Sequence, residues 1–421
     1  MNLNFSSLLG QLAKLKELKL HWQILFAILL GFIFGYLFPY QIKYTNWLGT
    51  VFIRALKMIV IPLVLTSLIN GMANIGSSKN LGRLGIKTLL YYLSTSLFAI
   101  FTGLFFVNYL KPGINTSLVL PDREDVSGLE IKKLSDTLIE IVPENIFKAF
   151  HENDMLATIF FAILIGFFIT RLNSKSKETM HSFFTASFDL IMKITFFIIG
   201  FAPFGIFGII AKVVGEQQNI DELIFSLGRF LIVCVSGLLI HFVVILPLLM
   251  YLIAKINPIE HFKAMITPLL TAFSTASSNA TLPLTMEHIE NKSQVSNKIS
   301  SFTLPLGATI NMDGTALYEI VVAGFVAQLY GIDLTLGQQL LMVMTALLSS
   351  IGTAGVPMAS FVTMTIVFSA VGLPFEAMAL IMPIDRPLDM LRTATNVWSD
   401  TCGTVIIAKT EGENIYHQYK T

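Results

Sequence analysis

The sequence has little charge for its length. Only 13% of its 421 residues are Asp, Glu, Lys or Arg, whereas 54% are hydrophobic. A water-soluble globular protein of this size needs much more polar surface to face the solvent, so that class is excluded. The composition instead predicts a protein embedded in a lipid bilayer.

Cysteine is also scarce. The two cysteines, Cys234 and Cys402, lie in apolar stretches, so we expect them to pack in the core rather than to form a disulfide or a metal site. The seven histidines are scattered, with no metal-ligand spacing and no paired nucleophile and base. An intramembrane enzyme is therefore only a distant alternative. The net charge of +1 indicates no particular partner, and no nucleic acid is expected.

Long apolar runs dominate the first 255 residues. A membrane-spanning helix needs roughly 20 apolar residues, and six clear runs lie at about 22–38, 48–70, 86–110, 153–170, 183–213 and 225–254. After residue 256 the apolar stretches continue but are interrupted by Ser, Thr, Asn, Asp, Gly and Pro. We therefore expect the chemistry in the second part of the chain.

Basic residues predict how the chain is oriented. Three lysines precede the first run, which places the N-terminus in the cytoplasm, and the first 20 residues are typical of an amphipathic surface helix rather than a cleaved signal peptide. The loops then alternate as six spans require. The mixed segment 112–152 and the Glu216 loop fall outside, and the basic residues fall inside: Lys14, Lys16, Lys19; Lys79, Arg83, Lys87; Arg171, Lys175, Lys177; Lys255 and Lys263.

Two stretches rich in small and hydroxyl residues form a weak internal repeat. They read STASSNATLPLT at 274–285 and SSIGTAGVPMAS at 349–360. An apolar segment bearing an Asn and an Asp follows each, and paired interrupted segments of this kind indicate the binding site of a transporter. The alternative is that small residues only let the helices pack closely.

The last apolar segment carries a polar stripe. At 100° per residue, six polar side chains lie within an arc of roughly 100° and Trp398 lies opposite: Asp385, Asp389, Arg392, Thr393, Asn396 and Asp400. Each ionised group at the bilayer centre costs roughly 2.5–3.5 kcal/mol, so the stripe is expected to face a functional interior. In the alternative, Arg392 merely pairs with Asp389, which would leave Asp400 and Asp313 without partners.

These side chains match the charges of an acidic amino acid. Asp389 can bind the ammonium group, Arg392 the side-chain carboxylate, and hairpin N–H groups with Ser278 the α-carboxylate. The remaining oxygens suit a hard cation such as Na⁺, and come from Asn311, Asp313, Asn396 and Asp400. The residues thus predict uptake of L-aspartate or L-glutamate together with sodium.

Four motifs resemble the glutamate transporter family, the dicarboxylate/amino acid:cation symporters that include archaeal aspartate transporters and eukaryotic excitatory amino acid transporters. The resemblance extends over nearly the whole chain. Its most specific parts are SSNATLP at 277–283, LPLGATINMDGTALYE at 304–319, SSIGTAGVP at 349–357 and LDMLRTATNVWSD at 388–400.

The resemblance implies an all-α polytopic membrane protein with inverted repeats. Eight transmembrane helices and two re-entrant hairpins, at about 258–291 and 336–371, would form a homotrimer in the plasma or inner membrane, with both termini cytoplasmic and no cofactor besides co-transported Na⁺. An elevator mechanism would move a transport domain, with hairpin two as the extracellular gate. The parts would be an amphipathic N-terminus (1–20), a largely scaffold region (21–255, with about 86–110 joining the transport domain), the core transport domain (256–410) and a cytoplasmic tail (411–421).

Ligands carry over from the family by motif. The substrate ligands would be Ser278, Thr315, Val356, Asp389, Arg392, Thr393 and Asn396. The sodium ligands would be Gly307, Asn311, Asn396 and Asp400; Thr309, Ser350, Ile351 and Thr353; and Tyr92, Thr95, Ser96, Asn311 and Asp313. Several of these would act through backbone carbonyl groups.

The chain departs from the family at a few positions. Archaeal relatives have an arginine where this chain has Ala276, eukaryotic relatives have one where it has Met390, and Asn279 replaces a serine. Arg386 could supply the positive charge of the missing arginine by pairing with Asp389, or it could simply pack against the helix.

Glu319 stands where proton-coupled eukaryotic relatives have glutamate and sodium-only archaeal relatives have glutamine. A carboxyl group in a low-dielectric site binds a proton more readily than in water, so Glu319 is a candidate proton carrier. The alternative is a buried, hydrogen-bonded acid. Potassium counter-transport would come with the same resemblance.

Three other transport functions compete with this prediction. A proton-coupled C4-dicarboxylate symporter of the same fold would not need Asp389, because its substrate has no ammonium group. A neutral amino acid symporter would not need Arg392. A passive channel is disfavoured by a site that matches every charge of its substrate. The preference between aspartate and glutamate stays open.

Overall fold

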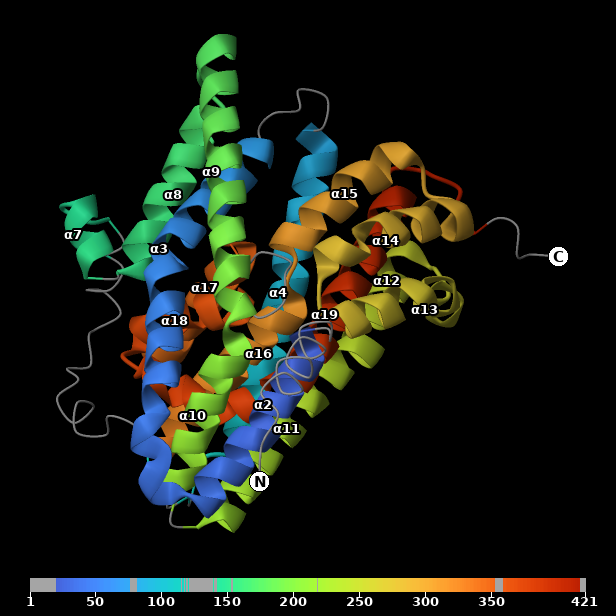
Figure 1. The fold of residues 1–421 in the computed structure, drawn as a ribbon. Helices are drawn as coiled ribbons and strands as arrows, with labels where there is room; N and C mark the ends of the chain where they lie inside the picture. The colour runs from blue at the N-terminus through green and yellow to red at the C-terminus, as the bar shows by residue number, and fades with distance from the viewer. Residues whose placement is uncertain are drawn as a thin grey trace, which may run out of the picture.

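A computed structural model describes residues 20–75, 82–114, 142–152, 154–217, 219–352 and 359–416, with isolated positions between 115 and 141. Over this part of the chain the secondary structure is helical and contains no strand (Figure 1). Several predictions lie outside the described residues: the N-terminal helix up to Lys19, the Lys79 loop, the hairpin residues Thr353 and Val356, and the tail from 417.

The first part of the chain forms apolar helices. They are α2 (Leu20–Leu37), η1 (Pro39–Tyr44), α3 (Asn46–Ile75), α4 (Gly82–Leu110), α7 (Ile146–His151), α8 (Met155–Ile169), α9 (Ser174–Gly200), α10 (Ala202–Glu216), α11 (Ile220–Ile240), the π-helical turn η2 (His241–Ile245) and α12 (Leu246–Ala254). The run at 183–213, predicted as one span, is instead divided between α9 and α10. The division falls at Phe201, and Pro203 begins the new helix where its missing N–H needs no partner.

The second part contains the helices around the predicted site. They are α13 (Pro258–Thr275), α14 (Ser278–Ser293), α15 (Asn297–Ile310), α16 (Asp313–Leu329), α17 (Leu336–Gly352), α18 (Ala359–Val371), η3 (Phe375–Ala377) and α19 (Met378–Thr410). The pairs α13–α14 and α17–α18 each pack together, and they occupy the places predicted for the two hairpins.

In the described part of the chain, five helical segments are long and apolar enough to cross a membrane. They are Asn46–Ala73, Arg83–Leu110, Ser174–Gly200, Ile220–Ala254 and Asn297–Leu329. The predicted spans at 22–38 and 153–170 fall on shorter apolar helices, Trp22–Leu37 and Ala157–Ile169. The chain is thus a helical membrane protein, as its composition predicts.

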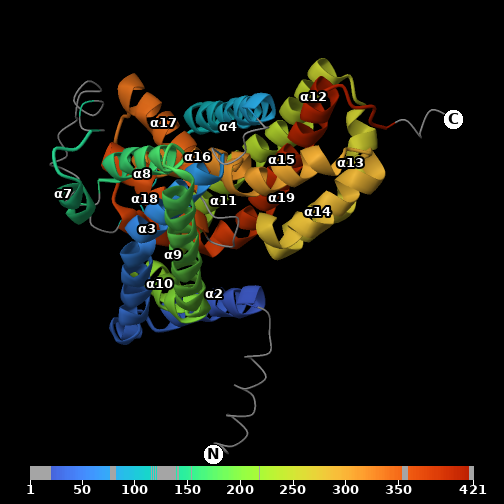
Figure 2. The same cartoon turned by 90° about the horizontal axis from the view of Figure 1, so that it is seen from above.

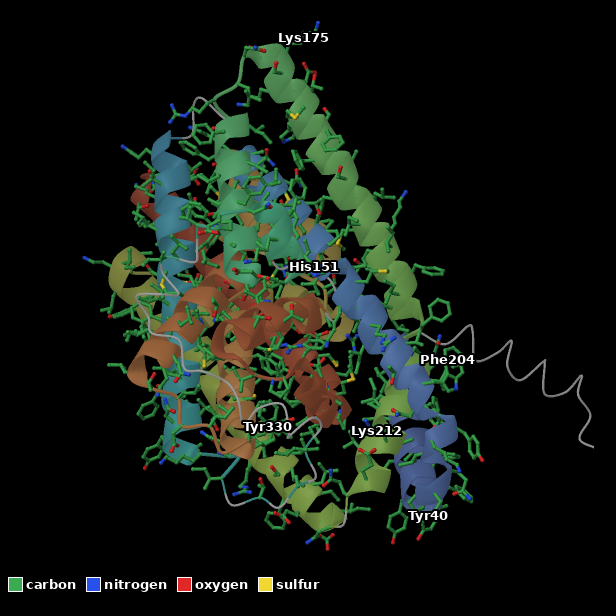
Figure 3. All side chains as sticks on the ribbon, turned by 90° about the vertical axis from the view of Figure 1, so that its left-hand side faces the viewer. Tyr40, His151, Lys175, Phe204, Lys212 and Tyr330 are labelled. Atoms are coloured by element: carbon green, nitrogen blue, oxygen red, sulfur yellow. The ribbon has the colours of Figure 1, made fainter. Side chains whose placement is uncertain are left out.

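The helices pack in two groups. We call α2, α3, α8, α9 and α10 the outer group, because α3 contacts α8, α9 and α10, and α10 contacts α2. Glycine lets α2 and α10 approach each other closely, because a Cβ on Gly35 of α2 would lie only 2.5 Å from the carbonyl oxygen of Ala211 in α10. Viewed from above, this group lies on one side of the molecule, and α12 to α15 with α19 lie on the other (Figure 2). Lys175 and Tyr40 mark opposite ends of the molecule (Figure 3).

The inner group consists of α4 and α11 to α19. Its two central helices are α16 and α19, and the other helices of the group surround them. The helix α19 contacts α4, α11 to α16 and also α10 of the outer group, and every residue of α16 except Gln328 is buried. The two-residue break between α15 and α16 leaves Asn311 and Met312 in non-helical conformations. Backbone polar groups are freed there, beside the polar stripe of α19.

Candidate functional site

Arg392 lies at the centre of a buried charged cluster on α19. Its side chain is 1% exposed and makes ion pairs with Asp385 (Nη1 to Oδ1, 3.2 Å) and Asp389 (Nη2 to Oδ1, 2.9 Å). The guanidinium also lies 3.8 Å from the ring centre of Tyr318 on α16, and the Tyr318 hydroxyl donates to Asp385 at 2.7 Å. The helical periodicity that predicted the stripe therefore brings its charges together.

Asp389 is already paired on both carboxylate oxygens. Oδ1 accepts from Arg392, and Oδ2 accepts from Nη1 of Arg386 at 3.1 Å. Arg386 therefore pairs with Asp389 rather than only packing against the helix. Guanidinium groups therefore contact both oxygens of the carboxylate that was expected to bind an ammonium group.

Spare hydrogen-bond donors remain in this cluster. Within the described residues, Nε of Arg386 and both Nε and Nη1 of Arg392 are buried without a hydrogen-bond partner. The Nη1 contact with Asp385 is an ion pair that lacks the alignment of a hydrogen bond. Buried unsatisfied donors are costly, and the two on Arg392 suit a carboxylate ligand.

The break between α15 and α16 carries a second polar network. Asp313 accepts from Ser96 of α4 at 2.7 Å and from Ser399 of α19 at 2.6 Å, and lies 3.0 Å from Nε2 of His241. Four elements of the inner group therefore meet at one carboxylate.

Asn311 links this network to Asp400. Its Nδ2 group lies 2.9 Å from both Ser399 Oγ and Asp400 Oδ1, and its Oδ1 accepts from Thr95 at 3.3 Å. The expectation that an Arg392–Asp389 pair would leave Asp313 and Asp400 without partners is therefore wrong. It failed because the partners come from helices that are distant in sequence.

Sequence reasoning missed His241 and Ser399 as members of the site. His241 is fully buried in the π-helical turn between α11 and α12. A histidine inside the apolar run at 225–254 is a signal that could have identified it, whereas Ser399 lies directly beside Asp400 and gives no such signal.

Asn396 of α19 holds the beginning of α16 at the helix break. Its Oδ1 accepts from the backbone N–H of Gly314 at 2.7 Å, and its Nδ2 lies 3.3 Å from Thr315 Oγ1. Gly314 permits this approach, because a Cβ there would lie 2.6 Å from the Arg392 carbonyl oxygen. The predicted substrate and sodium ligands thus share one amide side chain.

Gly307 and Tyr92 close the other side of Asp400. A Cβ on Gly307 would lie 2.4 Å from Asp400 Oδ1 and 2.8 Å from the Tyr92 hydroxyl. Tyr92 donates to the Thr303 carbonyl at 2.7 Å. Glycine is therefore required beside the carboxylate.

Other expected ligands are placed less directly. Ser278 is buried at the first position of α14, and Thr393 donates to the Asp389 carbonyl at 2.8 Å. Thr309 and Ser350 donate to carbonyl groups of their own helices, Leu306 and Leu347. Ile351 lies in α17, but its side chain is not among those that the structure describes.

Glu319 is fully buried on α16 and accepts hydrogen bonds from both helices of the second hairpin. Thr363 of α18 donates to Oε1 at 2.5 Å, and Ser349 of α17 donates to Oε2. A change in the charge of Glu319 would therefore act directly on the α17–α18 pair.

A cavity of about 420 Å³ lies apart from these residues, between α3, α10 and the beginning of α19. Arg54, Lys57 and Lys212 line it, and none of the expected ligands does. The expected ligands therefore lie in the buried polar networks, not in this cavity.

The chain is similar to known proteins over most of its length. The model of the sodium:dicarboxylate symporter family matches residues 20–410. The proton/sodium-glutamate symport protein of Geobacillus stearothermophilus is 36% identical over 409 residues, which cover 95% of this chain and 96% of the relative. Excitatory amino acid transporter 3 of Mus musculus is 35% identical over 418 residues, covering 87% of this chain and 79% of the relative.

Proposed function

The chain belongs to the sodium:dicarboxylate symporter family, and from this premise we propose that it is a sodium-coupled symporter of the acidic amino acids L-glutamate and L-aspartate. It is a transporter and not an enzyme. The names of its relatives, a proton/sodium-glutamate symport protein and an excitatory amino acid transporter, support this substrate class.

The observation that carries the proposal is the buried guanidinium group of Arg392 with its unused donors. Arg392 holds two nitrogen atoms, Nε and Nη1, without hydrogen-bond partners in the described structure. A substrate carboxylate would satisfy them by charge-assisted hydrogen bonds. A neutral amino acid would leave these donors unsatisfied, and a C4-dicarboxylate would give Asp389 no ammonium to bind.

Sodium binding is supported by the oxygen donors around the helix break. Carboxylate, amide and hydroxyl oxygens meet there and are ligands for a hard cation, with Asn311, Asp313 and Asp400 at the centre. Na⁺ would complete this set by replacing some of the hydrogen bonds among them. Because Asn396 lies one turn after Arg392 on α19 and holds the beginning of α16, which carries Asp313, sodium and substrate binding would favour each other.

We extend the proposal to the transport cycle. The inner group would move as a block against the outer group in an elevator motion, and α17–α18 would be the extracellular gate. The spans would number eight, with α13–α14 and α17–α18 re-entrant, both termini cytoplasmic and three copies forming a trimer. The contacts of α4 and α11 with α16, and of α12 with α19, support assigning these helices to the moving block, although α11 and α12 lie in the region predicted as largely scaffold. The boundary would lie where α3 contacts α18 and α10 contacts α19.

Glu319 would carry a proton in the same cycle, since its two hydrogen-bond donors belong to the proposed gate. Protonation would exchange a carboxylate for a neutral acid and change those contacts. In the assay below, Glu319→Gln is expected to remove the pH dependence of uptake. An unchanged pH profile would leave Glu319 as a structural acid.

The test is uptake into proteoliposomes. Wild-type protein is expected to concentrate labelled aspartate and glutamate only with an inward sodium gradient. Arg392→Thr should reduce this uptake roughly hundredfold or more, because the substrate carboxylate would be buried without its partner, yet permit sodium-driven uptake of serine or alanine. Arg171→Gln, on an exposed turn, is the control. Near-normal aspartate affinity in Arg392→Thr would contradict the proposed site.

A further inference from the structure

We infer that Arg386 is a tethered counter-cation that takes the place of the substrate ammonium on Asp389 when the carrier is empty. This inference rests on the proposed function and deepens it. It explains how the empty site can return across the membrane, a step that any accumulating carrier must complete.

The inference starts from the occupancy of Asp389. Both carboxylate oxygens are engaged, one by Arg392 at 2.9 Å and the other by Arg386 at 3.1 Å. An incoming ammonium group brings a third positive charge to a carboxylate that already contacts two guanidinium groups, and this repulsion favours withdrawal of one guanidinium when an amino acid binds. The two arginines are not equally able to do so.

Arg392 is held from three sides. It pairs with Asp385 and Asp389, lies over the Tyr318 ring, and has a side chain that is 1% exposed. Arg386 has Asp389 as its one ion-pair partner among the described residues, and its side chain is 10% exposed. Arg386 is therefore the guanidinium that can leave and return.

Replacement of the substrate ammonium group by Arg386 keeps the charge of the cluster balanced. Asp385 and Asp389 carry two negative charges, and Arg386 and Arg392 carry two positive charges, so the empty cluster is neutral. Without Arg386, release of the substrate would leave the cluster with one uncompensated carboxylate. Moving such a group through a low-dielectric region is strongly disfavoured.

A tethered cation differs from a diffusible one. Arg386 lies three residues before Asp389 on the same helix, so its effective concentration at the carboxylate is high and independent of the medium. The empty carrier would then return without a counter-transported cation, and potassium would not be needed inside the vesicle.

Two transport modes separate this role from a structural one. Exchange of external labelled glutamate for internal unlabelled glutamate requires only the loaded carrier, whereas net uptake into substrate-free vesicles requires the empty carrier to return. Both are measured with N-methylglucamine replacing potassium. The variants are Arg386→Gln, which keeps most of the side-chain volume, and Arg386→Lys, which keeps the charge, with Arg171→Gln as control.

The wild type and Arg171→Gln are expected to show both modes without potassium. Arg386→Gln should retain exchange with a lower KM, because the ammonium no longer competes with a guanidinium, while its net uptake falls at least about tenfold. Arg386→Lys should retain a larger ratio of net uptake to exchange than Arg386→Gln.

Three results would overturn the inference. They are an unchanged ratio of net uptake to exchange in Arg386→Gln, loss of exchange in a folded Arg386→Gln protein that still shows sodium-dependent thermal stabilisation, and a requirement of the wild type for internal potassium. If Arg386→Gln does not fold, two tests still decide: the wild-type potassium test, and the ratio of net uptake to exchange in Arg386→Lys, which is then expected to stay close to that of the wild type. Failure of the wild type to exchange any acidic amino acid would instead contradict the proposed function.

Discussion

Asp313 and Asp400 are buried carboxylates whose neighbours are hydroxyl, amide and imidazole groups rather than arginines. Asp313 contacts Ser96, Ser399 and His241, and Asp400 accepts from Asn311. Such neighbours orient the oxygens but provide little positive charge. A cation bound there would supply the missing charge, which is why these two residues are the strongest sodium candidates at the scale of single side chains.

Asp400→Asn is expected to weaken sodium and substrate binding together. The substitution removes one negative charge but keeps the shape, and linkage requires that a loss of coupling appear in both affinities, typically by about 5- to 150-fold. The measurement is the sodium dependence of aspartate uptake and the aspartate KM at fixed sodium. Asp154→Asn is a matched control, because Asp154 caps α8 and asparagine caps a helix equally well. Unchanged sodium dependence in Asp400→Asn would remove Asp400 from the sodium site.

Single residues also show where prediction from sequence stops. The stripe from Asp385 to Asp400 could be predicted, because helical periodicity is local and α19 is continuous. The pairing of Arg386 with Asp389 was open, since an i, i+3 spacing permits the contact without requiring it. The contact of His241 with Asp313 joins residues 72 positions apart, and no local pattern specifies it.

At the scale of elements, the first hairpin turns through a strained residue. Ala276 ends α13 with φ of +49°, in the left-handed region, and its N–H donates to the Ala272 carbonyl at 2.8 Å. A non-glycine residue in this conformation costs about 1 kcal/mol or more. The turn directs Ser277 and Ser278 to the beginning of α14, so the strain is located where the hairpin reaches the site.

Ala276→Gly should therefore stabilise the protein by up to about 1 kcal/mol, because glycine adopts positive φ without a steric penalty. Ala272→Gly, one turn earlier in a regular helix, should destabilise it by about 1 kcal/mol. Thermal unfolding of the purified proteins in detergent, at fixed sodium and substrate, compares the two. Equal losses in both variants would show that the turn is not strained.

Hairpin positions could be predicted because small-residue stretches and prolines are local signals. The division between α9 and α10 and the π-helical turn at His241–Ile245 could not, although Pro203 and Pro247 lie close to them. Proline is tolerated in the first turn of a helix, so its presence in an apolar run does not by itself locate a break. Tertiary packing decides where the chain bends.

At the scale of the whole molecule, the end of α19 is fastened to α4 by a bidentate ion pair. Arg83 donates to both oxygens of Glu411, at 3.1 and 2.9 Å, and Lys87 contacts the same carboxylate at 2.5 Å. Hydrogen bonds to these two cations lower the pKa of Glu411 to about 2. The contact joins two helices of the inner group at one end of the bundle.

Glu411→Gln is expected to lower the unfolding temperature slightly near neutral pH. Because the folded pKa lies below the ordinary value of 4.5, the contribution of Glu411 is present above about pH 4.5 and is lost as pH falls toward 2. The difference between wild type and variant should therefore shrink over that interval and also decrease with added salt, since the groups are partly exposed. A difference that is independent of pH and salt would assign the effect to packing.

The burial of α16 has a consequence for how the protein is made. The segment Asn297–Leu329 is the least apolar of the five candidate spans and its most apolar stretch is wholly buried. In the folded protein this stretch is therefore enclosed by other helices, and as the least apolar candidate it has the weakest partition free energy of the five for holding it in the bilayer as it leaves the ribosome. Its enclosure depends on α19, which follows it in the chain, so the inner group can close around α16 only after α19 has been synthesised.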